Sequence, residues 1–360
     1  MELSLYNVKI PLITPFTTSF GTEEYRDAII FHMKNEGIDA FSESVTSSIP
    51  DYGYEDNTTA THIIGDILCK YVTDVPAPEE FMKRSQSVRG HNMAKSAIEM
   101  LLWDYYSKYN KKPLDRYLGE SRGYANAGIS IGMSDLPSMI RQVGQAINRK
   151  YKRIKVKIRK GREDIVKAIR DTYPDIHLSV DANTDYSYGD LEYLKKLDRY
   201  NLEYIEQPLA GDDLIYHSRL SRQISTPICL DESITSPEKA EKALEIGACS
   251  VINIKPGRVG GLLNSIKIAK IAHEYGGHVW IGGMLETGIG RSFNIAMASQ
   301  KIVDFPGDTS PNDKYFKKDI VTNVFQMEDG TIKTNDGPGI GVGVDYGALF
   351  GYTISARRIL

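Results

Sequence analysis

Short apolar runs recur through the middle of the chain, and each ends in a residue that can bind a metal ion or move a proton. The runs are Arg153–Ile158, His177–Asn183, Tyr204–Pro208, Pro227–Ser233 and Ser250–Pro256. Within them Asp181, Glu206 and Asp231 follow one another at intervals of 25 residues, and Lys255 comes 24 residues later. Such an interval holds one strand, one helix and two short loops. The pattern therefore predicts one chemically active residue per strand–helix unit.

From residue 125 the chain alternates strand-like and helix-like segments, as α/β proteins do. Strands are expected near 125–132, 153–158, 177–183, 204–209, 227–233, 250–255, 278–283 and 302–305. Eight strands separated by helices favour a closed, TIM-like parallel barrel over an open sheet. The polar residues support this interpretation, because all strand ends of a barrel meet at one mouth. In an open sheet they would be strung along an edge roughly 20 Å long.

The segments on either side of the barrel follow other patterns. Residues 1–120 predict an α+β module, with strands at 3–12 and 27–33, a loop at 17–22, and helices at 58–73, 78–85 and 93–109. Residues 121–311 form the predicted barrel. Residues 312–360 lose the strand–helix rhythm, and we expect them to pack back on the amino-terminal module.

The charge composition of the chain limits which kind of molecule it is expected to bind. The 360 residues carry 44 Lys and Arg against 47 Asp and Glu, a net charge of −3, which offers no footprint for nucleic acid or an anionic membrane. The expected partner is a small molecule. Cys69, Cys229 and Cys249 lie far apart in apolar surroundings and are expected to be buried thiols. Without a signal-peptide pattern or a membrane-spanning run, we expect a cytoplasmic protein.

Three carboxylates at neighbouring strand ends predict a metal site. Asp181, Glu206 and Asp231 would converge at the barrel mouth, where like charges repel one another unless a cation neutralises them. Oxygen ligands suit a hard divalent ion, Mg²⁺ first and Mn²⁺ as an alternative. No His or Cys ends these strands, so a zinc site is not supported.

Lysines flank this predicted metal site. Lys155 and Lys157 are two residues apart on a strand and share its inner face, and Lys255 would approach from the opposite wall. A lysine acts as a base near neutral pH if nearby cations and burial lower its pKa. A metal ion and a lysine base together suit removal of the proton next to a carboxylate, because the metal stabilises the resulting ene-diolate.

Each of these signals also has an ordinary structural interpretation. A single Asp or Glu at a strand end often caps the next helix, and Lys-Val-Lys is a common exposed strand pattern. Five consecutive units with constant spacing and the same polarity favour the functional interpretation. Glu232, Asn183 and Asn253 are expected to be neighbours of the ligands, with Glu232 pointing away from Asp231 and the amides hydrogen-bonding the site.

The same residues resemble the enolase superfamily, muconate lactonizing enzyme subgroup. The resemblance lies in Lys155–Lys157, Asp181–Asn183, Glu206–Pro208, Asp231–Ser233 and Lys255–Arg258. Gly282–Arg291, Gly90–Lys95 and Pro306–Pro311 further resemble the o-succinylbenzoate synthase / N-succinylamino acid racemase family. The resemblance implies a modified (β/α)7β barrel under an α+β capping domain built from both chain ends. It also implies a symmetric homo-oligomer.

The resemblance assigns roles to individual residues. Asp181, Glu206 and Asp231 would hold Mg²⁺, and Lys157 and Lys255 would be the catalytic pair, supported by Lys155. A loop with Ser19, Phe20 and Gly21 would close the mouth, and Ser130, Met284, Leu285 and Ile289, with Asn183, would shape the pocket. The implied reactions are dehydration to o-succinylbenzoate, in the menaquinone pathway, and racemisation of N-succinylamino acids. Arg258 either lowers the pKa of Lys255 or pairs with a surface acid.

Departures from the family pattern and rival functions define the alternatives. Phe41–Ser44 and Ile49–Glu55 differ from the usual sequence of the cap. A dipeptide epimerase would be expected to carry Asp-x-Asp at strand eight, which Asp304–Asp308 lacks. An acid-sugar dehydratase would use a histidine at strand seven, but His278 starts that strand and is expected to be structural. The remaining alternatives are a cycloisomerase of the subgroup and a non-catalytic ligand-binding barrel.

Overall fold

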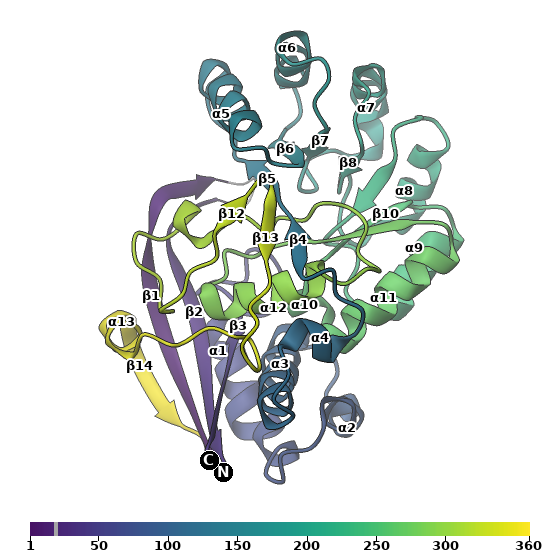
Figure 1. Cartoon of the computed structure of the whole chain (residues 1–360). Coiled ribbons are helices and arrows are strands. Elements are labelled where there is room, and N and C mark those ends of the chain that lie inside the picture. The colour runs from purple at the N-terminus through teal and green to yellow at the C-terminus, as the bar shows by residue number, and fades with distance from the viewer. Residues whose placement is uncertain (18–20) are drawn as a thin grey trace.

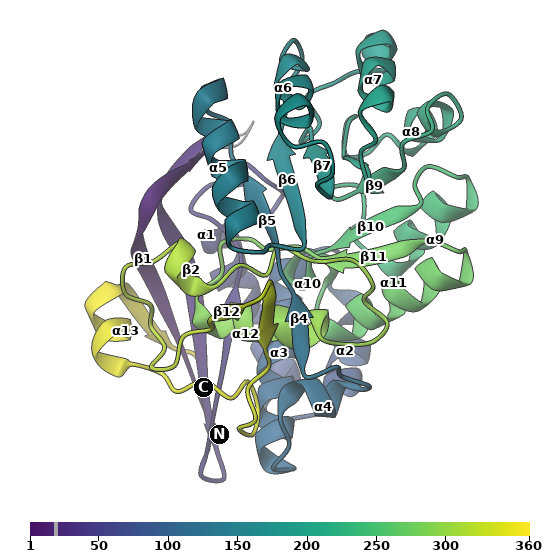
Figure 2. The same cartoon turned by 45° about the horizontal axis from the view of Figure 1, so that its top comes forward.

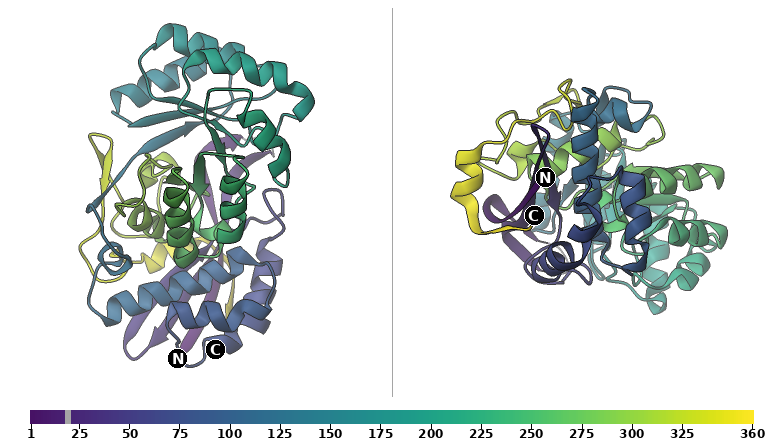
Figure 3. Two further views of the ribbon diagram at one scale, coloured as in Figure 1. Left: turned by 90° about the vertical axis from the view of Figure 1, so that its right-hand side faces the viewer. Right: turned by 90° about the horizontal axis from the view of Figure 1, so that it is seen from below.

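The computed structural model describes residues 1–17 and 21–360 and places a cap beside a barrel. Both chain ends lie next to each other in the cap, at the side remote from the barrel helices α5 (Leu136–Asn148), α6 (Asp164–Thr172) and α7 (Leu191–Leu197) (Figure 1). Seen from the side, the barrel stands on the cap, so the cap faces one end of it (Figure 3).

The cap contains a four-stranded antiparallel sheet in the order β14-β1-β2-β3. Its strands are β1 (Glu2–Thr17), β2 (Thr22–Asn35), β3 (Ile38–Ser44) and β14 (Thr353–Arg358). The turn from β2 to β3 is formed by Glu36 and Gly37, both with positive φ, as a tight two-residue hairpin requires. Of the loop expected at 17–22, residues 18–20 lie outside those described, while Thr17 ends β1 and Thr22 begins β2.

Helices cover one face of this sheet. They are α1 (Asn57–His62), the π turn η1 (Ile63–Ile67), the 3-10 turn η2 (Leu68–Tyr71), α2 (Pro78–Arg84), η3 (Ser85–Ser87), α3 (Asn92–Tyr109) and α4 (Leu114–Leu118). The helix expected at 58–73 is thus three short turns of different pitch. The long helix α3 packs Ala97, Ile98 and Leu101 against Leu5 and Phe31 of the sheet within one buried core. This core makes the cap a packed unit.

Seven parallel strands form the barrel sheet in their order along the chain. They are β5 (Gly128–Ile131), β6 (Arg153–Lys157), β7 (Leu178–Asp181), β8 (Ile205–Glu206), β9 (Ile228–Leu230), β10 (Val251–Ile254) and β11 (His278–Ile281). Between and after them lie α5 (Leu136–Asn148), α6 (Asp164–Thr172), η4 (Tyr188–Asp190), α7 (Leu191–Leu197), η5 (Asp198–Tyr200), α8 (Leu214–Ser221), α9 (Pro237–Glu245), α10 (Pro256–Val259), α11 (Leu262–Glu274) and α12 (Gly288–Ala298). Periodic apolar residues such as Met139, Val143 and Ala146 of α5 bury one face of a helix.

The expected eighth strand at 302–305 is wrong, because no strand forms there. Residues 305–308, which form no regular strand, close the barrel instead. The backbone N–H of Phe305 donates to Val279 O at 3.1 Å and that of Asp308 to Ile281 O at 2.9 Å, while Gly128 N–H donates to Gly307 O at 2.7 Å. Pro306 has no backbone N–H to donate to a neighbouring strand. This explains why residues 305–308 close the barrel without forming a regular strand.

The carboxyl-terminal segment returns along the outside of the barrel to the cap. It contains η6 (Asn312–Lys314), β12 (Met327–Glu328), β13 (Thr331–Lys333) and α13 (Tyr346–Tyr352), and β13 pairs with β4 (Tyr124–Asn126). Strand β14 then pairs antiparallel with β1. Figure 2 shows this segment, in yellow and yellow-green, passing β4 before it reaches β1. The cap sheet therefore includes both ends of the chain.

Two buried carboxylates of the cap hold the first turns of barrel helices. Glu99 of α3 accepts hydrogen bonds from the N–H groups of Leu262 and Leu263, both at 2.9 Å. Glu43 of β3 accepts from the N–H groups of Thr287 at 3.0 Å and Gly290 at 3.1 Å. The first N–H groups of a helix have no partner within the helix, so these contacts satisfy them and dock the cap on the barrel.

The three cysteines are buried and free, as expected. Among the described residues, no helix is long and apolar enough to cross a membrane.

Candidate active site

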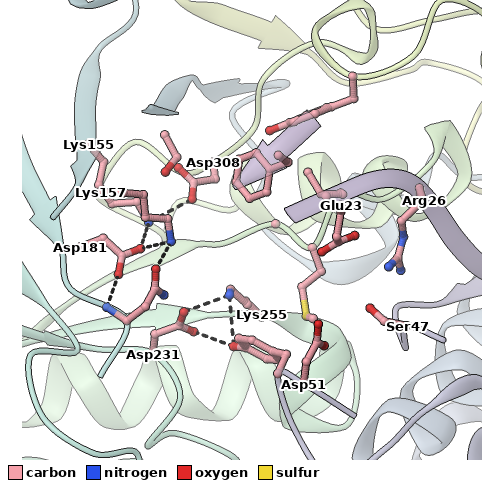
Figure 4. Close-up of a pocket in the computed structure, with 18 residues that line it drawn as sticks. Glu23, Arg26, Ser47, Asp51, Lys155, Lys157, Asp181, Asp231, Lys255 and Asp308 are labelled. Atoms are coloured by element: carbon pink, nitrogen blue, oxygen red, sulfur yellow. Dashed lines mark hydrogen bonds and ion pairs between the residues drawn. The ribbon is translucent and has the colours of Figure 1, made fainter. Parts of the chain in front are cut away.

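The parallel register brings the predicted acids to neighbouring strand ends. Lys157 pairs with Asp181, and Asp181 pairs with Glu206, at the carboxyl ends of β6, β7 and β8. Asp231 follows β9 directly. The side chains of all three acids are at most 2 % exposed. Figure 4 shows Asp181 and Asp231 on one side of a cavity, with Lys155, Lys157 and Lys255 beside them.

Several residues at this mouth have a strained backbone. Asn183 after β7, Gln207 after β8 and Leu285 after β11 all have positive φ, between 37° and 56°. Non-glycine residues adopt this conformation at a cost, and such residues gather at functional sites. The Gln207 side chain accepts hydrogen bonds from the N–H groups of Asp231 at 3.0 Å and Ser233 at 3.2 Å, which fixes the chain where Asp231 leaves its strand.

Each acid is paired with a cation. Lys157 Nζ lies 2.7 Å from Asp181 Oδ2, Lys155 Nζ 2.6 Å from Glu206 Oε2, and Lys255 Nζ 2.9 Å from Asp231 Oδ2. Arg258 Nη1 also contacts Asp231 Oδ1. The charges of the site are therefore balanced by its own lysines and by Arg258.

These pairs set the protonation states. Burial raises the pKa of Asp181, but Lys157 and Lys155 outweigh it and bring the pKa to about 2. The pKa of Glu206 is raised by its burial and by the charge of Asp181, against the effect of Lys155. Burial lowers the pKa of Lys255. Tyr52, Glu232 and Glu206 together raise this pKa by more than burial lowers it, so the net shift is upward. The lowered lysine pKa expected from the sequence is therefore not seen for Lys255 in this arrangement.

The donor atoms at the mouth are of the kind that a hard divalent ion prefers. Asp181, Glu206 and Asp231 present only carboxylate oxygens, and the side-chain oxygen Oδ1 of Asn253 beside Glu206 is buried without a hydrogen-bond partner among the described residues. Across residues 1–17 and 21–360, no three His, Cys, Asp or Glu side chains converge closely enough to hold a metal ion. The acids instead turn toward the lysines and Arg258.

The predicted neighbours of the acids all contact the site. Asn253 Nδ2 donates to Glu206 Oε1 at 2.8 Å, and Lys157 Nζ donates to Asn183 Oδ1. Asn183 Nδ2 donates to Glu232 Oε1 at 3.1 Å, so Glu232 reaches back toward the site. Arg258 is 5 % exposed and pairs with buried Asp231, and not with a surface acid.

A cavity of about 100 Å³ lies between the barrel mouth and the cap. Ser130, Met284 and Leu285 line it, together with Lys155, Lys157, Asp181, Asn183, Asp231 and Lys255. The hydroxyl of Ser130 is buried and has no hydrogen-bond partner within the described chain. Ile289 is fully buried in α12 and is not among the lining residues. Ser19 and Phe20 lie outside the described residues.

Several residues of the cavity were missed by sequence reasoning, and two of them, Asp308 and Tyr52, contact its lysines. Asp308 follows the irregular eighth stave and lies 3.2 Å from Lys155 Nζ and 2.6 Å from Arg153 Nη2. Asp308 lies at the end of the segment that closes the barrel, as the three acids lie at the ends of their strands. This position could have identified it as a site residue from the sequence. Tyr52 belongs to the unrecognised cap loop, and its hydroxyl lies 3.1 Å from both Asp231 Oδ1 and Lys255 Nζ. No local sequence pattern predicts that the Tyr52 hydroxyl reaches Asp231 and Lys255.

His278 does not take part in the site. It is the first residue of β11, is about half exposed, and its Nδ1 lies 2.6 Å from Asp304 Oδ2. It therefore sits at the end of the barrel opposite the strand-end acids, as expected for a structural histidine.

Two family models match the chain, one for each part of the fold. Residues 1–119 match the amino-terminal domain of mandelate racemase / muconate lactonizing enzyme, and residues 138–348 match the enolase C-terminal domain-like model.

Relatives match along nearly the whole chain. An o-succinylbenzoate synthase from Geobacillus stearothermophilus is 40% identical over 98% of this chain and 96% of the relative. An N-succinylamino acid racemase from Thermus thermophilus is 38% identical over 93% of this chain and 92% of the relative. A solved structure of an enolase superfamily member from Listeria innocua is 37% identical and superimposes with a TM-score of 0.96, covering 100% of this chain and 98% of that one.

Proposed function

Because the chain belongs to the mandelate racemase / muconate lactonizing enzyme family of the enolase superfamily, we propose that it removes the proton α to a carboxylate as an o-succinylbenzoate synthase, an N-succinylamino acid racemase, or both. The observation that carries this proposal is one cavity lined by Lys157 and Lys255, with the buried acids Asp181 and Asp231 between them. Removal and return of a proton needs basic groups placed in this way around a bound carboxylate.

In the proposed enzyme Asp181, Glu206 and Asp231 hold Mg²⁺, with Mn²⁺ as an alternative ion. When bound there, the ion supplies positive charge next to the substrate carboxylate, whose oxygens become more negative as the α-proton leaves. The lysines and Arg258 would have to release part of their contact with the acids. Asn253 and Asn183 would then orient the freed carboxylates through their hydrogen bonds.

In the synthase reaction Lys157 removes the α-proton of a cyclohexadiene carboxylate. The same side chain then assists the departure of hydroxide as water, which leaves the aromatic o-succinylbenzoate. Lys255 remains a cation on the other side of the cavity and stabilises the negative charge that develops. Its raised pKa supports this cationic role, since the group stays protonated at neutral pH.

In the racemase reaction both lysines exchange protons. One lysine removes the α-proton from one face of the substrate, and the other returns a proton to the opposite face. Lys157 comes from β6 and Lys255 from the end of β10, with three strands between them. Their origin on different walls of the barrel supports an approach from two faces.

One experiment separates these activities. The protein is incubated with Mg²⁺ in D₂O, with the synthase substrate and with a panel of N-succinylamino acids, while deuterium at the α-carbon and the ultraviolet absorption of the aromatic product are followed. Exchange without aromatic product indicates a racemase, and both signals indicate a bifunctional enzyme. Absence of both would refute the proposal and favour a non-catalytic ligand-binding barrel.

The alternatives within the subgroup have less support. A dipeptide epimerase would be expected to present two acids at strand eight, whereas the one acid of that stave in the cavity, Asp308, is held by Arg153 and Lys155. A cycloisomerase is tested by the same deuterium assay with its own substrate. The homo-oligomer and the cytoplasmic location stay predictions.

A further inference from the structure

The cap side of the active-site cavity carries two acids that have no direct ion-pair partner within the described chain. Glu23 and Asp51, together with Ser47, line the cavity on the side of the cap (Figure 4). Within the described residues, neither carboxylate forms a hydrogen bond or an ion pair. Glu23 is partly buried and Asp51 is exposed at the rim. A partly buried carboxylate such as that of Glu23 loses hydration and gains from a partner within the cavity, whereas Asp51 adds negative charge at the rim.

Arg26 does not compensate for these acids. It lines the same cavity and is 1% exposed, but its ion-pair partner is Glu43, with Nη2 3.8 Å from Oε1. Burial raises the pKa of Glu23, Arg26 lowers it, and Asp51 raises it again, so the three groups share one local field. The cap wall therefore holds Glu23 and Asp51 against one cation that already has an acidic neighbour.

The opposite wall, formed by the barrel, carries both lysines and acids. There Lys157 and Lys255 stand beside the acids that would hold the metal, and the α-carboxylate of the substrate would bind to them. Phe16, Met284 and Leu285 line the same cavity and give it an apolar surface. A substrate whose carboxylate binds at the lysines would extend its side chain within this cavity toward Glu23 and Asp51. A side chain with an alkyl stem and a terminal cation matches this apolar lining and the acids of the cap.

Resting on the racemase function proposed above, we propose that the cavity selects N-succinylamino acids with a cationic side chain, such as those of lysine and arginine. The ammonium or guanidinium group would lie between the carboxylates of Glu23 and Asp51. Ser47 would accept a further hydrogen bond at the same place. These three residues are thus determinants of specificity, and they do not touch the reacting carbon.

The test compares two substrates that differ only by the charge. N-succinyl-lysine and N-succinyl-norleucine share the same alkyl stem, and only the first ends in an ammonium group. With Mg²⁺ in D₂O, we expect kcat/KM for α-deuterium exchange to favour the lysine substrate by about tenfold or more, which is the value of a hydrogen bond to a charged group. The preference should shrink at high salt, because Asp51 is exposed.

Matched variants assign the preference to its residues. Glu23→Gln and Asp51→Asn should each reduce the lysine preference severalfold, and together remove it, while exchange of the norleucine substrate changes little. Glu24→Gln is the control, since Glu24 is the exposed neighbour that does not line the cavity. The norleucine rate of each variant reports whether it has folded.

The outcomes separate the two proposals. Equal or faster exchange of the norleucine substrate, or a lysine preference that survives in the double variant, would overturn the assignment of the acidic wall while leaving the racemase function intact. No exchange with either substrate would instead refute the racemase function, and this specificity with it.

Discussion

The carboxylate of Glu99, in helix α3 of the cap, accepts a hydrogen bond of 2.9 Å from the backbone N–H of Leu262, the first residue of the barrel helix α11. Trp103 Nε1 also donates to this carboxylate, at 2.7 Å. Glu43 makes the equivalent contact with Thr287 at the start of α12. The departure noted at Phe41–Ser44 therefore contains a residue that docks the cap. These two buried acids therefore connect the cap directly to the first turns of α11 and α12.

The stability of the protein should fall as the pH rises toward neutrality. Burial is the main cause that raises the pKa of Glu43 and of Glu99 to about 7, from 4.5. The folded state then binds protons more tightly than the unfolded state, so the stabilisation is complete below the unfolded pKa and is lost as the pH rises through 7. Each group contributes at most about 3 kcal/mol to this loss.

Urea unfolding at about pH 5 and about pH 8 measures this effect. Glu99→Gln cannot ionise and should lose less stability over this interval than the natural protein, although it is less stable at low pH. The exposed control Glu24→Gln should keep the natural pH dependence. A natural protein whose stability changes no more than that of Glu99→Gln would contradict the prediction.

Gly261→Ala should destabilise the junction of cap and barrel. A Cβ at Gly261 would lie 2.3 Å from Glu99 Oε2, and the residue has φ of +115°. The control is Gly276→Ala, which has φ of +72° but meets no atom within 4 Å. We expect a loss in the free energy of unfolding of about 1 kcal/mol for the control and about 3 kcal/mol or more for Gly261→Ala. Equal losses would show that Glu99 moves aside freely.

Lys157→Ala should abolish both proposed reactions, because the base that removes the proton is gone. Lys255→Ala should first eliminate exchange from one enantiomer of an N-succinylamino acid. A loss of at least about 100-fold is expected for each affected reaction. Exposed Lys160→Ala serves as the control. Full activity in either active-site variant, measured by α-deuterium exchange, would refute the assigned roles.

Metal binding should be detectable without any assay of activity. If Asp181, Glu206 and Asp231 hold the ion, added Mg²⁺ raises the thermal midpoint of the natural protein, since a ligand that binds only the folded state stabilises it. Glu206→Gln should reduce the shift strongly, because Glu206 is fully buried on β8, between the strands that carry Asp181 and Asp231 to the mouth. An undiminished shift in this variant would place the metal elsewhere. Chelation should abolish activity, and Mg²⁺ should restore it.

Replacing Tyr52 by phenylalanine should affect the site without unfolding the protein. The Tyr52 hydroxyl contacts Asp231 and Lys255 at 3.1 Å and Arg258 Nη1 at 2.7 Å, so Tyr52→Phe leaves three buried polar groups with one partner fewer. We expect kcat/KM to fall by about tenfold and the thermal midpoint to fall only slightly, because Asp231, Lys255 and Arg258 still pair with one another. Unaltered kinetics would show that the hydroxyl moves away during turnover.

Local patterns predicted the barrel and the residues at its mouth. Lys155 and Lys157 share a face because side chains alternate along a strand, and Asp181 and Glu206 meet because parallel strands end together. The eighth stave was placed three residues too early. The apolar run at 302–305 resembled a strand. The backbone hydrogen bonds that close the barrel instead begin at Phe305 and continue to Asp308.

The amino-acid sequence by itself determined the order of strands and helices, the family, and which acids and lysines come to the mouth, because these follow from short-range periodicity. Only the tertiary structure decided what covers that mouth. Tyr52, Glu23 and Asp51 reach the cavity from a cap loop and a cap strand, and Glu43 and Glu99 hold that cap in place. Such contacts join residues far apart in the chain through packing, and no local pattern of hydrophobic and polar positions encodes them.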